Sequence, residues 1–218
     1  MAMKLGYWKI RGLAQAIRLE MKYLGLDFTD EFYVQGPAPD FDSSSWFGVK
    51  ETLGLDFPDL PYLVDGDMKM TQTWAIMRYV ARKAGKLVPK TEAETVAVDM
   101  CEGAITDLRR ALSATCYSPK YLELREGFLK KAATWLMRFS SYLKGKKWLA
   151  GNNLTFVDFT LYELLDVLRI FEASLLEPVP DLKAYMTEFE ALPGMKEYLK
   201  SEQCMKTPCN NTIARWSK

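Results

Sequence analysis

Residues 61–70 read Pro-Tyr-Leu-Val-Asp-Gly-Asp-Met-Lys-Met and carry the strongest local signal in the chain. Two short runs of strand-forming residues flank Asp65-Gly66, a dipeptide typical of tight turns between antiparallel strands. The sequence therefore predicts a β-hairpin here. Leu60-Pro61, directly before it, is a candidate cis peptide bond, because X-Pro bonds adopt that form most easily and tight turns favour it.

The residues before and after the hairpin alternate between strand and helix patterns. Strands are expected over residues 3–7 and 28–34. Apolar residues at helical spacing between them, followed by Gly25, predict a helix that ends at a left-handed cap. This alternation is typical of an α/β domain. The other helices expected in this part are a short one after serines 43–45, carrying Trp46 and Lys50, and one over residues 72–83.

Beyond residues 85–90 the pattern becomes almost entirely helical. Apolar stripes at helical spacing run over residues 100–112, 128–143 and 182–189. Pro119 is expected at the first position of the second of these helices. We therefore predict an α/β domain over residues 1–84, a linker over 85–90 and an all-helical domain over 91–218.

Asp158 is a lone carboxylate in the apolar run Leu154-Thr155-Phe156-Val157-Asp158-Phe159, and such a residue invites a catalytic interpretation. Its spacing from Thr155 instead favours a capping box, in which each of the two side chains bonds the backbone N–H of the other residue. Leu154 and Phe159 occupy the positions of a hydrophobic staple around that cap.

Composition and charge exclude several classes of protein. The 218 residues are 49% hydrophobic and 26% charged, with 29 Lys+Arg against 28 Asp+Glu, which is ordinary for a globular protein. No basic cluster indicates nucleic acid as a partner. The four cysteines lack CxxC spacing, the first residues lack the apolar run of a signal peptide, and no apolar run approaches the ~20 residues of a membrane span. We expect a cytoplasmic protein that does not bind membranes.

The chain contains no histidine. Ser-His-Asp and Cys-His catalysis are therefore excluded, and the usual nitrogen ligands of transition metals are missing, so no metal site is expected. Any catalysis must use tyrosine, lysine, cysteine, a hydroxyl or a carboxylate.

Two positions suit ligand binding in an open α/β sheet. Tyr7-Trp8 ends the first strand just before a turn at Gly12, where such sheets place ligand-binding groups; the alternative is a core aromatic. Gln72-Thr73 opens a helix, whose free amides attract a carboxylate; the alternative is a simple helix cap.

Several ordered motifs together are more specific than these single positions. They are LGYWKIRGLAQ at 5–15, GPAPDFD at 36–42, LGLDFPDLPYL at 53–63, TQT at 71–73, AIMRY at 75–79 and ARWS at 214–217. This set resembles the mu-class cytosolic glutathione S-transferases over essentially the whole chain. The resemblance implies a thioredoxin-like domain followed by an all-helical domain, and a homodimer.

The resemblance implies that Tyr7 is the catalytic residue and that glutathione is a co-substrate, with no further cofactor. A thiol of pKa about 8.5 is only about 3% ionised at pH 7. A phenol of pKa near 10 stays protonated and can donate a charge-assisted hydrogen bond to the thiolate. This chemistry requires neither histidine nor a metal.

The resemblance also implies a set of glutathione contacts. Trp46 and Lys50 would hold the glycyl carboxylate, and the Leu60 backbone would pair with the cysteinyl segment like an added strand. Gln72 and Thr73 would bind the γ-glutamyl carboxylate. The full set implied for glutathione is Tyr7, Trp8, Trp46, Lys50, Asp59, Leu60, Gln72, Thr73 and, from the neighbouring subunit, Asp107.

An apolar electrophile would lie against Trp8, Leu13 and Tyr117, whose hydroxyl either polarises the electrophile or belongs to a core aromatic. The sequence departs from the family pattern at Ser43, Asp59, Thr73 and Trp74, and Ser113 and Ala114 are unusually small. Asp59 and Ser43 make the tripeptide site more negative, which would weaken binding of an anionic tripeptide. Two functions therefore stay open, a detoxifying transferase that conjugates glutathione to apolar soft electrophiles, and a weakly catalytic or non-catalytic protein that binds glutathione or apolar ligands.

Overall fold

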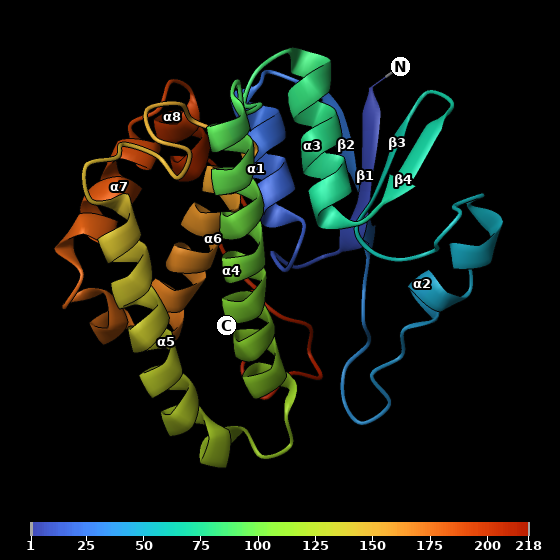
Figure 1. The fold of residues 1–218 in the computed structure, drawn as a ribbon. Coiled ribbons are helices and arrows are strands. Elements are labelled where there is room, and N and C mark those ends of the chain that lie inside the picture. Colours follow the sequence, from blue (N-terminus) through green and yellow to red (C-terminus); the bar gives the residue numbers. More distant parts are fainter. Residues whose placement is uncertain (1, 218) are drawn as a thin grey trace.

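A four-stranded sheet forms the centre of the N-terminal domain in the computed structural model, which describes residues 2–217 (Figure 1). The strand order is β2-β1-β3-β4, with β1 parallel to β2 and antiparallel to β3. The predicted hairpin is confirmed as β3 and β4, and Leu60-Pro61 is cis. The strands are β1 (Met3–Trp8), β2 (Phe28–Tyr33), β3 (Tyr62–Asp65) and β4 (Met68–Thr71).

The pairing of β1 with β3 depends on a glycine at position 6. Gly6 lies opposite Tyr62 in the register, and a Cβ built on Gly6 would lie 2.0 Å from the Tyr62 ring. Any larger residue would therefore displace that ring. Leu5 and Leu63, also paired, are fully buried and form the apolar face of the sheet.

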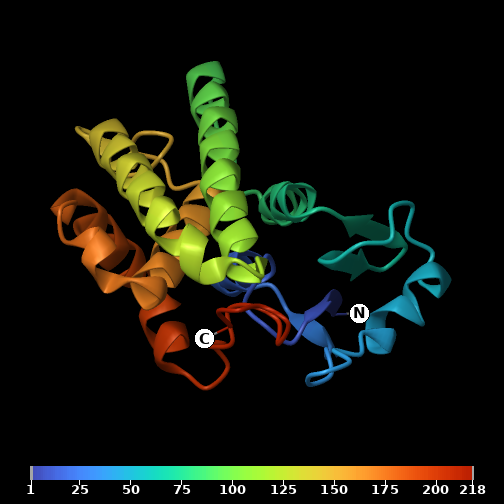
Figure 2. The same cartoon turned by 90° about the horizontal axis from the view of Figure 1, so that it is seen from below.

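Helices α1 (Gln15–Tyr23) and α3 (Thr73–Ala84) cover the sheet on the side of the helical domain. In Figure 2, α3 lies between the hairpin and the helical domain. Gly25 and Gly85 follow the two helices with positive φ angles of 67° and 64°, as expected for left-handed caps. On the other side of the sheet the chain forms the short helix α2 (Ser44–Phe47) and a 3₁₀ turn, η1 (Lys50–Thr52).

The C-terminal domain consists of helices, of which α4 and α5 are long and run antiparallel (Figure 1). Helix α6 is buried along almost its whole length. The predicted fold class, a thioredoxin-like domain followed by a helical one, is confirmed. Its elements are α4 (Glu92–Tyr117), α5 (Tyr121–Leu143), α6 (Phe156–Phe171), η2 (Ala173–Leu176), α7 (Pro180–Glu190) and α8 (Met195–Lys200). The boundaries 1–84, 85–90 and 91–218 stay a prediction.

A buried ion cluster joins the two domains. The Arg11 guanidinium, in the loop after β1, lies 2.6 Å from carboxylate oxygens of both Glu163 and Asp166 on α6. Arg11 and Glu163 are almost completely buried. Removing either charge would leave the other uncompensated in the interior. Among residues 2–217, no helix is long and apolar enough to cross a membrane.

Two local expectations were wrong. Helix α5 begins at Tyr121, and Pro119 lies in the preceding turn. Lys50 is not part of the helix that carries Trp46, because that helix ends at Phe47. Ser43 does precede it, but its side chain does not cap it, since the hydroxyl donates to the Phe41 carbonyl at 3.1 Å.

The capping box at the start of α6 is confirmed. Asp158 accepts hydrogen bonds from the backbone N–H groups of Thr155 and Leu149, each at 2.9 Å, and from the Tyr185 hydroxyl at 2.9 Å. Burial raises the pKa of the Asp158 carboxyl to about 6 in spite of these donors. The carboxylate thus connects the start of α6 to the preceding loop and to α7.

Thr155→Ala is expected to lower the free energy of unfolding by about 1 kcal/mol, the usual cost of losing an N-cap side chain. The kinetics of the folded fraction should stay unchanged, because Asp158 lies in the core of the helical domain. Urea unfolding and steady-state rates of the same preparation test both statements. Loss of turnover in Asp158→Asn with an unchanged melting temperature would instead support the catalytic interpretation.

Candidate active site

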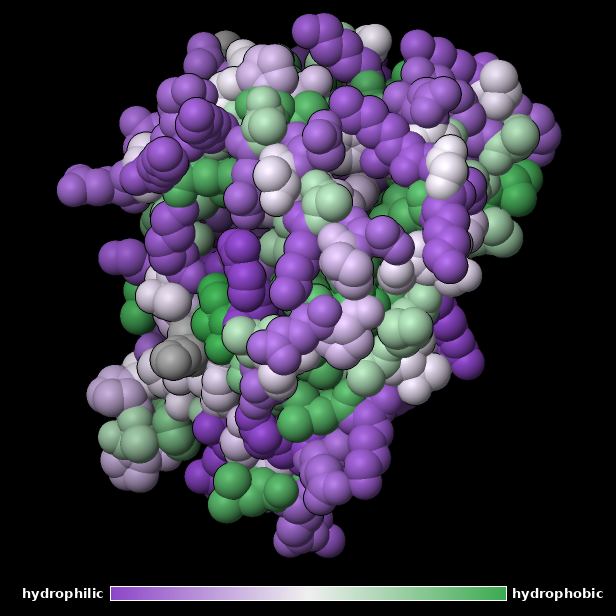
Figure 3. Space-filling view, turned by 90° about the vertical axis from the view of Figure 1, so that its left-hand side faces the viewer, coloured by the Kyte–Doolittle hydropathy of each residue, from purple (hydrophilic) through white to green (hydrophobic). Residues whose placement is uncertain are grey.

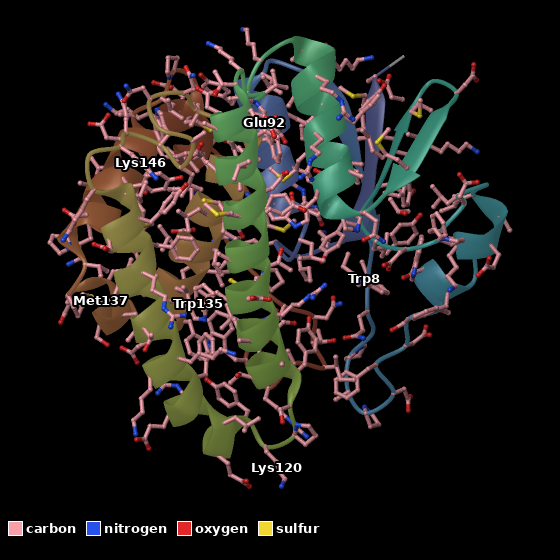
Figure 4. The ribbon with its side chains drawn as sticks, viewed as in Figure 1. Trp8, Glu92, Lys120, Trp135, Met137 and Lys146 are labelled. Atoms are coloured by element: carbon pink, nitrogen blue, oxygen red, sulfur yellow. The ribbon has the colours of Figure 1, made fainter. Side chains whose placement is uncertain are left out.

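A cavity of about 410 Å³ lies between the end of β1, the start of α3 and the face of α4. Trp8 marks its position at the end of β1 (Figure 4). The cavity brings together many of the residues that the sequence singled out. Those lining it are Tyr7, Trp8, Leu13, Gln72, Thr73 and Tyr117.

The Tyr7 hydroxyl is held by the backbone of the loop after β1. Its oxygen accepts the Leu13 N–H at 2.9 Å, and the side chain is only 6% exposed. Burial raises the Tyr7 pKa to about 12. The phenol therefore keeps its proton at neutral pH, and because its oxygen already accepts one bond, that proton can be donated to a ligand. Tyr7 thus lies at the cavity wall, where its O–H group can donate a hydrogen bond to a ligand.

Gly12 is required for this arrangement. Its φ is +43°, and a Cβ at this position would lie 2.5 Å from the Tyr7 hydroxyl oxygen. A side chain would clash with the oxygen and strain the backbone together. The glycine in the β1–α1 loop therefore lets the backbone approach the phenol closely enough for the Leu13 bond.

The start of α3 presents backbone amides at the same cavity. Gln72, the residue before the helix, has φ of 75° and ψ of 116° and makes no side-chain capping bond. A non-glycine residue in this region costs on the order of 1–3 kcal/mol, and such strain collects at functional sites. Gln72 is therefore the residue before the helix, but its side chain does not cap it. Free amides at this helix end suit a carboxylate.

Trp46, Lys50, Asp59 and Leu60 do not line this cavity. The buried Trp46 ring stacks on Tyr62, and Lys50 lies 3.4 Å from the Glu51 carboxylate. The Trp46–Tyr62 contact places α2 beside β3. The structure does not bring the four residues together with Tyr7 in one enclosed space.

Asp59 bonds the backbone of its own loop. Its Oδ1 accepts the Leu60 N–H at 2.8 Å, and among residues 2–217 it has no ion-pair partner. Leu60 itself is buried. The backbone donor that the resemblance assigns to the cysteinyl segment is therefore already bonded to a carboxylate.

Tyr117 is exposed to the cavity at the end of α4. It is 36% exposed, and its hydroxyl oxygen accepts the Asn211 N–H at 2.9 Å. Tyr117 is therefore a partly exposed residue of the cavity wall and not a core aromatic. Leu13 is 41% exposed at the same wall. Asp107 is exposed on α4 and does not line the cavity of its own chain.

Sequence reasoning missed Arg109. This half-buried residue lines the cavity, and its Nη1 donates to the Gly12 carbonyl at 3.3 Å. Burial lowers the pKa of its guanidinium. The helical spacing of Arg109, Ser113 and Tyr117 was the signal that could have revealed it, because residues four apart share one face of α4.

Known protein families match both domains of the chain. Family models for the glutathione S-transferase N-terminal and C-terminal domains match residues 3–82 and 106–202. Glutathione S-transferase Mu 1 of Bos taurus is 45% identical over 216 residues, covering 99% of each chain. Glutathione S-transferase Mu 3 of Homo sapiens is 46% identical over 215 residues, covering 99% of this chain and 95% of the relative.

A solved structure agrees along the whole chain. The crystal structure of the glutathione S-transferase Blo t 8 matches with a TM-score of 0.91 at 34% identity, covering 99% of this chain and 100% of that one. A thioredoxin-like domain followed by an all-helical domain is the architecture that this chain shares with the glutathione S-transferases. The chain belongs to the glutathione S-transferase family, and the predicted resemblance to its mu class is confirmed.

Proposed function

We propose that this protein conjugates the thiolate of glutathione to apolar, soft electrophiles. The observation that carries the proposal is the Tyr7 hydroxyl, whose oxygen is bonded by the Leu13 N–H at 2.9 Å and whose proton is available at the cavity wall. A hydrogen bond to a charged partner contributes about 1.5–3 kcal/mol. Tyr7 therefore favours the thiolate over the thiol.

The remaining contacts position the tripeptide. Free amides at the start of α3, with Gln72 and Thr73, attract the γ-glutamyl carboxylate, and Asp107 of the partner subunit approaches its amino group. Trp46 and Lys50 supply donors for the glycyl carboxylate. The Leu60 backbone pairs with the cysteinyl segment once it is released from Asp59. No cofactor is required, because glutathione itself provides the nucleophile.

The chemical step forms a carbon–sulfur bond. With an aryl chloride, the thiolate sulfur attacks the ring carbon, and chloride leaves with the electron pair of its bond. With an enone or epoxide the electron pair moves to oxygen, where the Tyr117 hydroxyl can donate a proton. Trp8 and Leu13 supply apolar surface for the electrophile.

The alternative is a protein that binds glutathione or apolar ligands with little turnover. Calorimetric titration with glutathione, beside conjugation of 1-chloro-2,4-dinitrobenzene, separates the two functions. The transferase binds glutathione and turns the aryl chloride over. Binding without turnover would support the alternative, and the absence of both would contradict the transferase and any role in binding glutathione.

Asp59→Asn is expected to tighten glutathione binding, by no more than about tenfold in Kd. The change removes a negative charge beside an anionic tripeptide and weakens the acceptor that holds the Leu60 N–H. The gain should shrink as salt is added, because exposed charges are screened. Calorimetry at low and high ionic strength measures it, with the nearby exposed Asp56→Asn as the matched control. Equal affinities of parent and Asp59→Asn at low salt would contradict the prediction.

We further propose a twofold homodimer. Phe57 is 75% exposed in the loop before β3, where it has no apolar core of its own to enter. Met68 and Met100 are also exposed by more than half. On the side of the molecule seen in Figure 3, hydrophilic side chains prevail and apolar ones form small groups. We therefore assign the contact to the Phe57 loop, which inserts between helices of the partner.

Phe57→Ser is expected to weaken the dimer, because it removes a large aromatic group from the interface. Sedimentation over a range of protein concentrations measures the change in association, with Phe47→Ser, another exposed phenylalanine, as the control. If Phe57→Ser stays as stably dimeric as the parent, the residue instead packs on its own domain.

The proposed role is detoxification in the cytoplasm. All four cysteines are free and buried, in keeping with a reducing compartment. Apolar electrophiles are the compounds that such a compartment must neutralise before they react with protein thiols.

A further inference from the structure

The lining of the cavity that holds Tyr7 carries positive charge and no carboxylate among the described residues. Arg109 and Arg110 are its charged lining residues, and no Asp or Glu is found among the described residues that line it. The surrounding wall is largely apolar or aromatic. Its apolar members include Trp8, Ile10, Leu13, Ile105 and Leu112.

Arg109 differs from the other arginines that are withdrawn from solvent. Within residues 2–217 it forms no ion pair; the buried Glu163 carboxylate attracts it but is itself bound to Arg11. Its one hydrogen bond goes to the Gly12 carbonyl. A guanidinium has five donors, so most of its capacity is unused. The other arginines that are not fully exposed all pair with carboxylates, namely Arg11 with Glu163, Arg18 with Asp30, Arg78 with Glu102 and Arg125 with Glu172.

The guanidinium of Arg109 is connected to Tyr7 through one peptide group. Its Nη1 donates to the carbonyl of the peptide group between Gly12 and Leu13, and the N–H of the same peptide bonds the Tyr7 hydroxyl. Arg109 and Tyr117 lie two helical turns apart on one face of α4 and line the same cavity. An anion on the guanidinium would therefore lie beside the site of thiolate attack.

We propose that Arg109 makes the cavity selective for electrophiles that carry a carboxylate or a similar compact anion on an apolar body. This inference rests on the proposed function and narrows the class of electrophile. A planar guanidinium binds a carboxylate through two parallel hydrogen bonds. A half-buried cation in an apolar wall is less screened than a surface lysine, so its preference for an anion is stronger. The anionic group keeps its charge during the reaction, in which sulfur replaces chloride on the ring.

The test compares two aryl chlorides that differ in one group, 4-chloro-3-nitrobenzoate and 4-chloro-3-nitrobenzamide. The measured quantity is the ratio of kcat/KM for the acid to kcat/KM for the amide. Arg109→Gln is expected to lower this ratio at least tenfold, because it removes the charge that binds the carboxylate. Differences in intrinsic reactivity cancel, since the same pair is used for every variant.

Two further variants make the result specific. Arg138→Gln makes the same charge change on an exposed arginine of α5 that stacks on Trp135, and it should leave the ratio unchanged. Arg109→Lys keeps the charge without the planar pair of donors and should give an intermediate ratio; it also serves where Arg109→Gln folds poorly. An equal loss for acid and amide would overturn the inference and would instead make Arg109 a positioning residue that acts on Tyr7 through the 12–13 peptide.

A binding measurement keeps this inference separate from the proposed function. The dissociation constants of the acid and the amide are measured with S-methylglutathione bound, which cannot react. If the parent binds the acid more tightly than the amide and Arg109→Gln loses this difference, the charge selectivity is supported. Absence of turnover of both compounds by the parent would contradict only the proposed function. If the acid binds no tighter than the amide, the selectivity is wrong even in an active transferase.

Discussion

Tyr7→Phe is expected to raise the pH at which bound glutathione ionises and to slow conjugation roughly 10- to 150-fold, which corresponds to about 1.5–3 kcal/mol. The variant removes the only proton that Tyr7 can donate to the thiolate. It also removes the acceptor of the Leu13 N–H, but it keeps the aromatic ring against Gly12, so the loop after β1 should stay close to its parent position. Glutathione affinity should change little, because the amides at the start of α3 are untouched.

The measurement follows the thiolate by its ultraviolet absorbance as the pH of the binary complex is raised. In the parent, burial keeps the Tyr7 pKa at about 12, so the phenol remains a donor throughout the range in which the thiol titrates. Tyr79→Phe is a matched control, since the Tyr79 hydroxyl bonds Asp65 at 2.7 Å and lies outside the cavity lining. An unchanged thiolate titration in Tyr7→Phe would remove the assignment of Tyr7.

Short sequence patterns correctly predicted the turns and helix ends that depend on neighbouring residues. The Asp65-Gly66 hairpin, the Gly25 cap after α1, and the capping box of Thr155 and Asp158 were all found where the sequence predicted them. Each depends on residues within a few positions of one another. The errors at Pro119 and Lys50 concern element ends, where one or two residues decide the outcome.

The site was only partly predictable, because tertiary contacts assemble it. Tyr7 and Gln72 were found from their places at a strand end and a helix start. Two hydrogen bonds complete the site. The Leu13 N–H bonds the Tyr7 hydroxyl, and Arg109 on α4 bonds the Gly12 carbonyl in the loop after β1. The spacing of Arg109, Ser113 and Tyr117 places them on one face of α4, but it does not show that this face lies against the loop after β1.

The sequence also did not reveal that the carboxyl group of Glu20 is buried. Glu20 lies on α1 between residues that pack on the sheet and on α6, and its side chain is completely buried. Among residues 2–217, neither of its carboxyl oxygens has a hydrogen-bond partner. Burial alone raises the pKa of Glu20 well above its usual range. At pH values between the unfolded pKa and this raised pKa, the native protein therefore keeps a proton on Glu20 that the unfolded chain releases.

Glu20→Leu is expected to stabilise the fold by about 1–3 kcal/mol at neutral pH, the typical cost of an unsatisfied buried polar group. Because the folded-state pKa is raised, the native state binds more protons than the unfolded state between the unfolded pKa of about 4.3 and the folded-state pKa, and parent stability falls as pH rises through that interval. Leucine removes this dependence. The advantage of the variant should therefore grow with pH, by at most about 1.4 kcal/mol per unit.

Urea unfolding at pH 5, 7 and 9 measures this trend, at one fixed protein concentration because a dimer's stability depends on concentration. Glu20→Gln cannot ionise but keeps an unsatisfied polar group, so it should remove the pH dependence while stabilising less than leucine. Glu126→Leu, on the exposed face of α5, controls for the loss of a charge and should change stability by no more than about 0.5 kcal/mol, without a pH trend. If the stabilities of the parent and of Glu20→Leu instead fall equally as pH rises, Glu20 does not cause the pH dependence. Its carboxyl then has a hydrogen-bond partner or solvent contact in the native state.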